Sequence, residues 1–367
     1  MKITGTFVIS ALFIITISLV LIGVIMVFSS SHGVLLIKGE NVYAKMGRQL
    51  MYLSISLAGM SFFSLYDYNQ WERKARWLLL FTIVLLALVF SSIGVYANGA
   101  YRWINLVIFN FQPSDLLKLS MVLYLAAAWA DRREELAYIS AKLIFPLLFV
   151  GLAVFLVVIE ADHSTTVLLG LIIAAIWYAA GGRLYHLIPV TIVFVSGIIA
   201  VLYEKPHLFA RVKAWIQPTA YPDESMQMVQ SMNSFALGGL WGRGLGEGFQ
   251  KLGFVPEVHT DFIFSTMGEE LGFVWCSFIL LMFLGLIFLG FWIALKCGNP
   301  FGRLIAIGIT ATIALQTAMN VAVVSGAVPT TGLSLPFISY GGSSLLIFLC
   351  MTGLLMNVAR DTFMTME

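Results

Sequence analysis

Charged residues are scarce in this sequence. Only 11% of its 367 residues are Asp, Glu, Lys or Arg, whereas 60% are hydrophobic and the mean hydropathy is +0.93. A soluble domain cannot bury that much apolar surface, and apolar runs of membrane-spanning length recur along the chain. The composition therefore predicts a polytopic membrane protein and excludes an ordinary soluble domain.

Cysteine is scarce too, and basic residues do not cluster. Cys276, Cys297 and Cys350 lie within or at the ends of apolar runs, without paired or metal-ligand spacing, so we expect no disulfide. The basic residues are scattered over short loops and the formal net charge is only +2, which excludes a nucleic-acid partner. We also find no internal repeat, low-complexity tract or separate soluble domain.

Ten apolar segments have about the 20 residues that a membrane-spanning helix needs. We predict helices at 7–28, 47–65, 77–96, 114–130, 142–160, 165–181, 187–203, 272–296, 303–325 and 343–359. The first segment is longer than the apolar core of a signal peptide, so we predict an uncleaved span. The expected fold is an all-α polytopic membrane protein with a single integral membrane domain over residues 1–367.

Basic residues in short loops predict the orientation. An even number of spans puts both termini on one side, together with Lys2, Arg73, Lys74, Arg76, Arg132, Arg133, Lys142, Arg183, Lys296, Arg303 and Arg360. The short loops of the other side hold fewer, namely Lys38, Lys45, Arg48, Arg102 and Lys118. This excess predicts cytoplasmic termini. The long loop at 204–271, between spans seven and eight, is then extracytoplasmic.

Titratable residues gather at the end of that long loop. Residues 255–272 contain Glu257, His259, Asp261, Glu269 and Glu270. Such a cluster in a chain with so little charge indicates a functional site. The alternative for Asp261 is a structural role, as the N-cap of a helix over 264–271.

A second polar segment precedes the fourth span. Pro113 and Ser114 predict a helix start, with Ser114 as the cap and Asp115 in the first turn. Asp115 and Lys118 are three residues apart, so they share a helix face and can form an ion pair. That pair is either structural or part of a substrate path. Arg102 is either an interfacial anchor or a bidentate phosphate clamp.

The turn between spans five and six holds Glu160, Asp162 and His163. Three potential ligands so close in sequence rarely converge on one metal ion. A capped turn is therefore favoured, with Asp162 or Ser164 accepting hydrogen bonds from the first amides of span six. The glycine run at 238–246 is a weaker signal, typical of a flexible connection or of a backbone that approaches a bulky head group.

The last outer loop, 326–342, contains Pro329, Pro336, Gly341 and Gly342 and cannot form a continuous helix. Irregular backbone at membrane depth persists only where it is buried in protein or lines a watery cavity. Ser343 and Ser344 are predicted to cap span ten, whose N-terminal amides can bind an anionic phosphate.

Three motifs in these segments resemble the signatures of the SEDS family, the shape, elongation, division and sporulation proteins. They are PTTGLSLPFISYGGSS at 329–344, PEVHTDFIF at 256–264 with GEELG at 268–272, and GAYRWI at 99–104 with QPSDLLK at 112–118. The resemblance covers nearly the whole chain. His259, Thr260 and Gly268 are more similar to the division branch of the family than to its elongation branch.

The resemblance implies a peptidoglycan glycosyltransferase that polymerises lipid II on the outer face of the bacterial cytoplasmic membrane. It also implies three kinds of partner: the growing lipid-linked glycan strand, a class B penicillin-binding protein, and other membrane proteins of division or elongation. Asp261 matches the loop aspartate taken to be catalytic, and the candidate substrate-binding residues are Arg102, Asp115, Lys118, Asp162, Glu257, His259, Ser339 and Ser343. The sequence departs from the family at Tyr101, Asp115, Thr331 and Glu160–Ala161.

The chemistry of such a reaction suits these residues. A sugar 4-hydroxyl attacks an anomeric carbon while a lipid pyrophosphate departs, so one general base suffices, and Asp261 is the candidate. Arg102 and Lys118 are expected to offset the pyrophosphate charge, a role that a divalent cation, Mg²⁺ or Mn²⁺, can share. Two other interpretations stay open: a transporter of the lipid-linked precursor, and a non-catalytic scaffold for division proteins.

Overall fold

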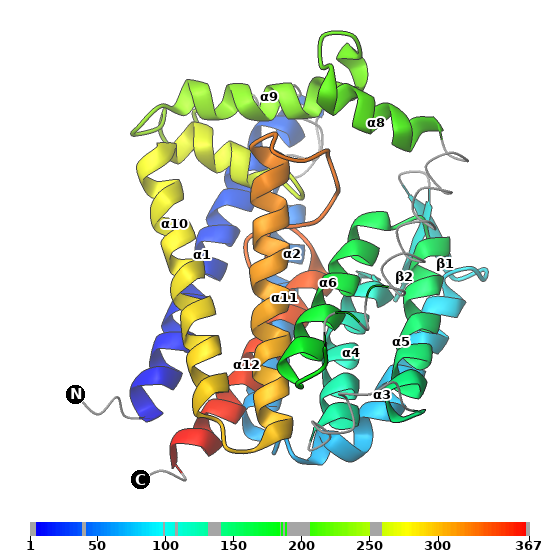
Figure 1. The fold of residues 1–367 in the computed structure, drawn as a ribbon. Helices are drawn as coiled ribbons and strands as arrows, with labels where there is room; N and C mark the ends of the chain where they lie inside the picture. The colour runs from blue at the N-terminus through cyan, green and yellow to red at the C-terminus, as the bar shows by residue number, and fades with distance from the viewer. Residues whose placement is uncertain are drawn as a thin grey trace.

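The computed structural model describes residues 5–38, 42–97, 100–106, 109–130, 141–183, 185, 188, 206–249 and 259–364. Long helices run along the molecule from one end to the other, as Figure 1 shows. The first, α1 (Gly5–Lys38), begins at the end where the last, α12 (Gly342–Met364), terminates. The described chain is mostly helical, as the sequence predicts.

Nine helices of the described chain fall on predicted spans. Besides α1 and α12 they are α2 (Val42–Leu65), α3 (Gln70–Leu88), α4 (Pro113–Trp129), α5 (Ala141–Ile159), α6 (His163–Ala179), α10 (Ile263–Lys296) and α11 (Pro300–Val324). By length and apolar composition, α1, α10, α11 and α12 can cross a membrane, and α5 and α6 are shorter apolar helices. The seventh predicted span, 187–203, lies outside the described residues except for Ile188.

A small antiparallel sheet corrects the prediction for the third span. Its strands, in the order β1–β2–β3, are β1 (Gly94–Ala97), β2 (Ala100–Asn105) and β3 (Asn110–Phe111). The predicted helix at 77–96 was wrong at its end, because α3 stops at Leu88 and a hydrogen-bonded turn follows, in which Gly94 N donates to Ser91 O over 3.0 Å. The expectation of an all-α fold was therefore wrong for residues 94–111.

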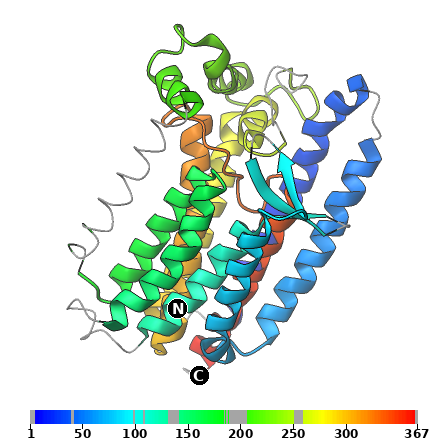
Figure 2. The same cartoon turned by 90° about the vertical axis from the view of Figure 1, so that its right-hand side faces the viewer.

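The described part of the long loop is largely helical. It forms α8 (Pro206–Ile216) and α9 (Pro222–Gly238), which lie across the end of the bundle opposite to the start of α1 (Figure 1). Figure 2 shows the strands of the sheet displaced toward that same end. The last part of the loop, 263–271, belongs to α10, so the eighth helix begins earlier than the predicted residue 272.

A kink divides α10 at Gly272, whose φ of 79° and ψ of 179° are not helical. A Cβ atom on Gly272 would lie 2.2 Å from the backbone nitrogen of Gly242, so this close approach requires glycine. Phe273 N also donates to Gly239 O over 2.9 Å. The glycine run at 238–246 is thus hydrogen-bonded to and packed against the kink. The interpretation of this run as a flexible connection was wrong.

Helices from both halves of the sequence pack around a common interior. α12 packs against α2, and α11 packs against α4, α6 and α10. Trp129 of α4 and Trp177 of α6 are fully buried, and their ring centroids are 5.2 Å apart. This packing brings the first turns of α4, α6 and α12 to the same end of the molecule.

Candidate active site

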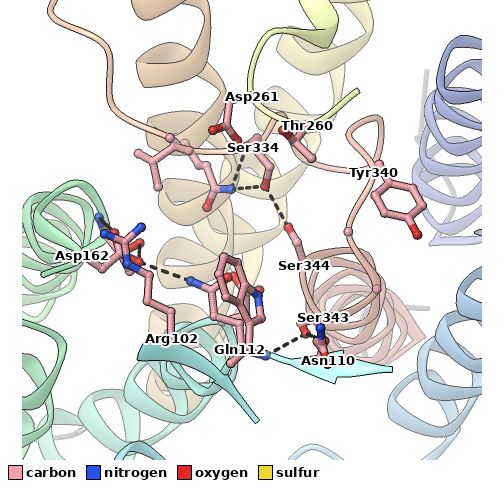
Figure 3. A pocket seen from close by; sticks show the side chains of 18 of the residues that line it. Arg102, Asn110, Gln112, Asp162, Thr260, Asp261, Ser334, Tyr340, Ser343 and Ser344 are labelled. Carbon is pink, nitrogen blue, oxygen red and sulfur yellow. Dashed lines mark hydrogen bonds between the residues drawn. The ribbon is translucent and has the colours of Figure 1, made fainter. Parts of the chain in front are cut away.

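A cavity of about 430 Å³ lies between the sheet, the first turns of α4, α6 and α12, and the segment 259–262. Polar side chains from these separate parts of the chain point toward one another across it (Figure 3). Six of the nine candidate residues line the cavity: Arg102, Asp115, Lys118, Asp162, Asp261 and Ser343. The other three are Glu257, His259 and Ser339.

Asp261 lies in the turn that precedes α10. Its backbone oxygen accepts a 2.8 Å hydrogen bond from Asn320 Nδ2, and the same amide group donates to Leu333 O over 2.7 Å. The N-cap of α10 is Phe262, which has no side-chain cap bond. The capping role that we considered for Asp261 is therefore wrong, and its carboxylate faces the cavity instead (Figure 3).

Asp115 and Lys118 form the predicted ion pair, with Lys118 Nζ 2.8 Å from Asp115 Oδ1. Lys118 is only 2% exposed and also donates to Gln316 Oε1 over 2.9 Å. Gln316 in turn donates through Nε2 to Ser334 O over 2.8 Å. The pair therefore joins α4 to α11 and to the last outer loop, and it also contributes to the wall of the cavity.

Arg102 extends from β2 to the turn between α5 and α6. Its Nη2 atom donates to Ala161 O over 2.7 Å, and its Nε atom donates to Glu160 O over 3.4 Å. Both acceptors are neutral backbone carbonyls, so the guanidinium keeps its full charge beside the cavity. Within the described part of the chain, backbone carbonyls and not a carboxylate hold the arginine in place, in keeping with the phosphate-clamp interpretation.

Asp162 is the N-cap of α6, which confirms the predicted capped turn. Its Oδ1 atom accepts from Thr165 N over 3.2 Å, and its Oδ2 atom accepts from Thr165 Oγ1 over 2.8 Å. Gln112 Nε2 also donates to Asp162 Oδ2 over 3.3 Å. Asp162 therefore combines a structural role with a place in the cavity wall.

The predictions that Ser114 caps α4 and that Ser343 and Ser344 cap α12 were wrong. The N-cap of α4 is Gln112, followed by Pro113 at the first helical position, whereas Ser114 is one residue further along and accepts from Gln112 Nε2 over 3.0 Å. Helix α12 begins at Gly342, so Ser343 and Ser344 lie within its first turn. Ser343 Oγ accepts from Gln112 N over 2.9 Å and thereby joins α12 to the start of α4.

His259 and Ser339 lie behind the cavity wall. Ser339 Oγ donates to Thr260 O over 2.7 Å, and Tyr340 N donates to His259 O over 2.9 Å. These bonds attach segment 259–262 to the last outer loop and so fix the backbone around Asp261. Glu257 lies outside the described residues.

Several other residues in or near this region were not singled out from the sequence. Arg48 and Tyr52 of α2 line it together with Tyr340. Burial and, to a smaller extent, Tyr52 raise the pKa of Tyr340 to about 12, and the charge of Arg48 opposes the shift. On α8, burial of the guanidinium and the like charge of Arg102 lower the pKa of Arg211, whereas Asp261 raises it.

Glu269 and Glu270, from the same charged stretch as Asp261, are buried away from the cavity at 0% and 1% exposure. Phe249 N donates to Glu269 Oε1 over 2.7 Å, and Gly246 N donates to Glu270 Oε2 over 3.0 Å. Ser29 Oγ donates to Glu270 Oε2 over 2.5 Å. These carboxylates anchor segment 243–249 to α10 and α1, which makes them structural.

The cavity carboxylates do not form a cluster of metal ligands. Among the described residues, no group of three or more His, Cys, Asp or Glu side chains is placed to hold a metal ion. Asp115 is paired with Lys118, and Asp162 caps α6. We therefore derive no chemical step through a divalent cation.

Comparisons with known proteins agree with the motifs. The sequence model of the FtsW, RodA and SpoVE family, described as "Cell cycle protein", matches residues 10–363. A probable peptidoglycan glycosyltransferase FtsW of Geobacter sp. (strain M18) is 39% identical over 341 residues, which is 92% of each chain. The stage V sporulation protein E of Bacillus subtilis (strain 168) is 35% identical, over 95% of this chain and 96% of that protein.

Solved structures share the fold. One chain in a structure on the coordination of polymerization and crosslinking by a peptidoglycan synthase complex superimposes with a TM-score of 0.78. It is 26% identical in sequence, and the match covers 96% of this chain and 97% of that chain.

Proposed function

This chain belongs to the FtsW, RodA and SpoVE family of cell cycle proteins, and from that premise we propose that it is a peptidoglycan glycosyltransferase that polymerises lipid II into glycan strands. It is a multi-pass membrane protein. We place it in the bacterial cytoplasmic membrane, with the termini inside and the 204–271 loop and the cavity at the outer face. Similarity to FtsW relatives favours a role in cell division, with elongation as the alternative.

The position of Asp261 is the observation that carries the proposal. This carboxylate faces a polar cavity from a backbone held by Asn320, and it does not cap the following helix. We propose that it takes the proton of the sugar 4-hydroxyl as that oxygen attacks the anomeric carbon of the lipid-linked donor. The bond from the anomeric carbon to the pyrophosphate oxygen breaks, the lipid pyrophosphate leaves, and the new glycosidic bond forms with inversion.

Of the two candidate cations predicted from the sequence, Arg102 is better placed than Lys118 to offset the charge of the leaving pyrophosphate. Among the described residues its guanidinium bonds to two backbone carbonyls, so it can also donate to an anion in the cavity. Lys118 is already paired with Asp115 and bonded to Gln316, so its charge is partly offset. We assign Lys118 mainly to the shape and polarity of the cavity floor.

The remaining candidates fall into two groups under this proposal. Asp115, Asp162 and Ser343 line the cavity, where they contact the sugars or the pyrophosphate of the substrate. His259 and Ser339 position Asp261 through the backbone of segment 259–262. Glu257, which lies outside the described residues, is proposed to contact the substrate.

The chemistry and the fold also suggest the partners. Lipid II supplies one substrate, and the growing lipid-linked glycan strand supplies the other. Similarity to a chain of a peptidoglycan synthase complex supports a class B penicillin-binding protein as the partner that crosslinks the strand. Other membrane proteins of division or elongation complete the proposed assembly.

The proposal is tested by glycan synthesis from lipid II with the purified chain and its penicillin-binding partner, whose transpeptidase is blocked by a β-lactam. Asp261→Asn keeps the size of the side chain and removes its basicity. Polymer formation should fall by at least ~100-fold without loss of folding or of the complex. Asp223→Asn, an exposed aspartate on α9, is the matched control and should polymerise like the wild type.

Other outcomes would identify the competing functions. Equal polymer from wild type and Asp261→Asn would remove this carboxylate from the mechanism. An absence of polymer from either protein, with lipid II carried across liposome membranes, would support a transporter. If neither activity occurred but the complex still assembled, the chain would be a scaffold.

A further inference from the structure

Glu160 is a buried carboxyl group to which the proposed mechanism assigns no role. It follows the last residue of α5 and lies in the turn that leads to α6. The residue is 2% exposed, and neither Oε1 nor Oε2 has a hydrogen-bond partner among the described residues. A carboxylate in such surroundings is strongly disfavoured compared with a neutral carboxylic acid.

Two charged groups act on Glu160. Arg102 of β2 lies close by, since its guanidinium donates to the backbone oxygens of Glu160 and Ala161. Asp162 follows two residues later as the cap of α6. The Arg102 charge favours an ionised Glu160, and the Asp162 charge disfavours it.

The helices packed against α5 add few other titratable groups at this end. α4 carries Asp115 and Lys118, which pair with each other, and α6 begins with His163. α3 also packs on α5, but its charged residues lie in its first two turns, at the opposite end of the bundle. Arg102 is therefore the cation that an ionised Glu160 would meet first.

Burial and the neighbouring Asp162 raise the pKa of Glu160 to about 8, against the opposing effect of Arg102. The ionised fraction of Glu160 therefore increases between pH 7 and pH 9. This change of charge occurs within the range in which a bacterial enzyme can be assayed, and it occurs next to the cation assigned to the leaving pyrophosphate.

We propose that Glu160 is a positioning residue for Arg102, which it leaves facing the cavity when protonated and withdraws into an ion pair when ionised. The inference rests on the proposed function in that the anion bound by Arg102 is taken to be a lipid diphosphate. Protonated Glu160 places no competing charge beside the guanidinium. Ionised Glu160 competes with the diphosphate for that guanidinium, so the cavity binds the anion more weakly.

The test measures binding of farnesyl diphosphate to the purified full-length protein at pH 7 and pH 9. Wild type should bind about tenfold more weakly at pH 9, the expected effect of one competing charge-assisted hydrogen-bonded pair. Glu160→Gln has nearly the same shape but cannot ionise, so its affinity should be the same at both pH values. Glu72→Gln, an exposed glutamate on α3, is the control and should keep the pH dependence of the wild type.

Two further variants separate positioning from a merely structural role. Glu160→Met removes the carboxyl without adding an amide and should also abolish the pH dependence, even if it lowers the stability. Arg102→Gln should bind weakly at both pH values, because the group that Glu160 positions is absent. Equal loss of affinity at pH 9 in wild type, Glu160→Gln and Glu160→Met would overturn the inference.

The same variants distinguish this inference from the proposed function. If the pH dependence of diphosphate binding disappears in Glu160→Gln but no variant polymerises lipid II, the positioning role stands and the glycosyltransferase proposal falls. If wild type polymerises lipid II and its diphosphate affinity does not depend on Glu160 at either pH, the proposed function stands and the positioning role falls.

Discussion

Two groups of carboxylates in this protein illustrate different uses of a scarce charge. The anchoring pair, Glu269 and Glu270, is fully buried and accepts hydrogen bonds from backbone amides of segment 243–249. The cavity carboxylates, Asp115, Asp162 and Asp261, line a polar cavity shared by helices from both halves of the sequence. Only eight positions separate Asp261 from Glu269, yet the two residues differ completely in their surroundings.

The anchoring pair forms its hydrogen bonds through the carboxylates, whereas Asp261 is held through its backbone oxygen. The anchoring pair fixes a glycine-rich segment against the kink at Gly272, so its charge is used in the fold. Asp261 is fixed through its backbone, by Asn320, which leaves the side chain directed at the cavity. In a chain with few charged residues, a carboxylate is therefore expected to have a structural or a functional role. The hydrogen bonds around it indicate which of the two it has.

The largest loss of stability is expected when the anchoring pair is changed. Glu270→Ala would remove the acceptor of Gly246 N and of the buried Ser29 Oγ, so we expect a loss of about 3 kcal/mol in the free energy of unfolding. Thermal unfolding of the purified protein measures it. Glu247→Ala, at an exposed glutamate of the same segment, should change the stability by less than ~0.5 kcal/mol.

Glu160 differs from both groups of carboxylates. It is buried like the anchoring pair, but its carboxyl oxygens have no hydrogen-bond partner among the described residues. Its pKa rises from 4.5 to about 8 in the folded protein. The stability associated with the neutral group is fully present below pH 4.5 and is lost as the pH rises toward 8. Unfolding measured from pH 5 to pH 9 should show Glu160→Gln gaining at least ~2 kcal/mol over wild type. A constant difference across that range would contradict this expectation.

Asp162 is intermediate, since it caps α6 and lines the cavity. Asp162→Ala should cost about 1 kcal/mol of stability, the usual value of a lost N-cap. Asp162→Asn keeps a capping side chain, so it should unfold within ~0.5 kcal/mol of wild type. Loss of polymerisation in the stable Asn variant would place the charge of Asp162 in the cavity chemistry. Full activity there would make it a cap only.

The smallest effect is expected at Arg211, on α8, whose charge interacts with Asp261 and Arg102. Arg211→Gln should raise the apparent KM for lipid II by about threefold and leave kcat and stability unchanged, because its charge acts on the site only electrostatically and is screened by salt. The increase should shrink at higher ionic strength. Lys213→Gln on the same helix is the control, and an equal change in both variants would show only a general effect of positive charge.

Local rules predicted the contacts that are close in sequence. The spacing of Asp115 and Lys118 predicted an ion pair on one helix face, and the structure contains it at 2.8 Å. The short turn before span six predicted a cap by Asp162 or Ser164, and Asp162 forms it. Apolar runs predicted the helices, because burial in a bilayer depends on composition over about 20 residues.

Contacts between distant parts of the chain could not be predicted in this way. Arg48 and Tyr340 reach the same cavity from positions almost 300 residues apart. The sheet at 94–111 was missed because its apolar residues continue the run of α3, and pairing between strands is a tertiary event. Glu269 and Glu270 were grouped with Asp261, because their acceptor role depends on a glycine-rich segment 20 to 24 residues earlier.

We propose that Asp261 serves the reaction, whereas Glu269 and Glu270 serve the fold. One experiment tests both halves: lipid II polymerisation and thermal unfolding measured side by side for wild type, Asp261→Asn and Glu270→Gln. We predict that Asp261→Asn unfolds like wild type and makes no polymer, whereas Glu270→Gln unfolds at a lower temperature and polymerises in proportion to its folded fraction. Polymer from Asp261→Asn, or a fully folded Glu270→Gln that makes none, would contradict the account.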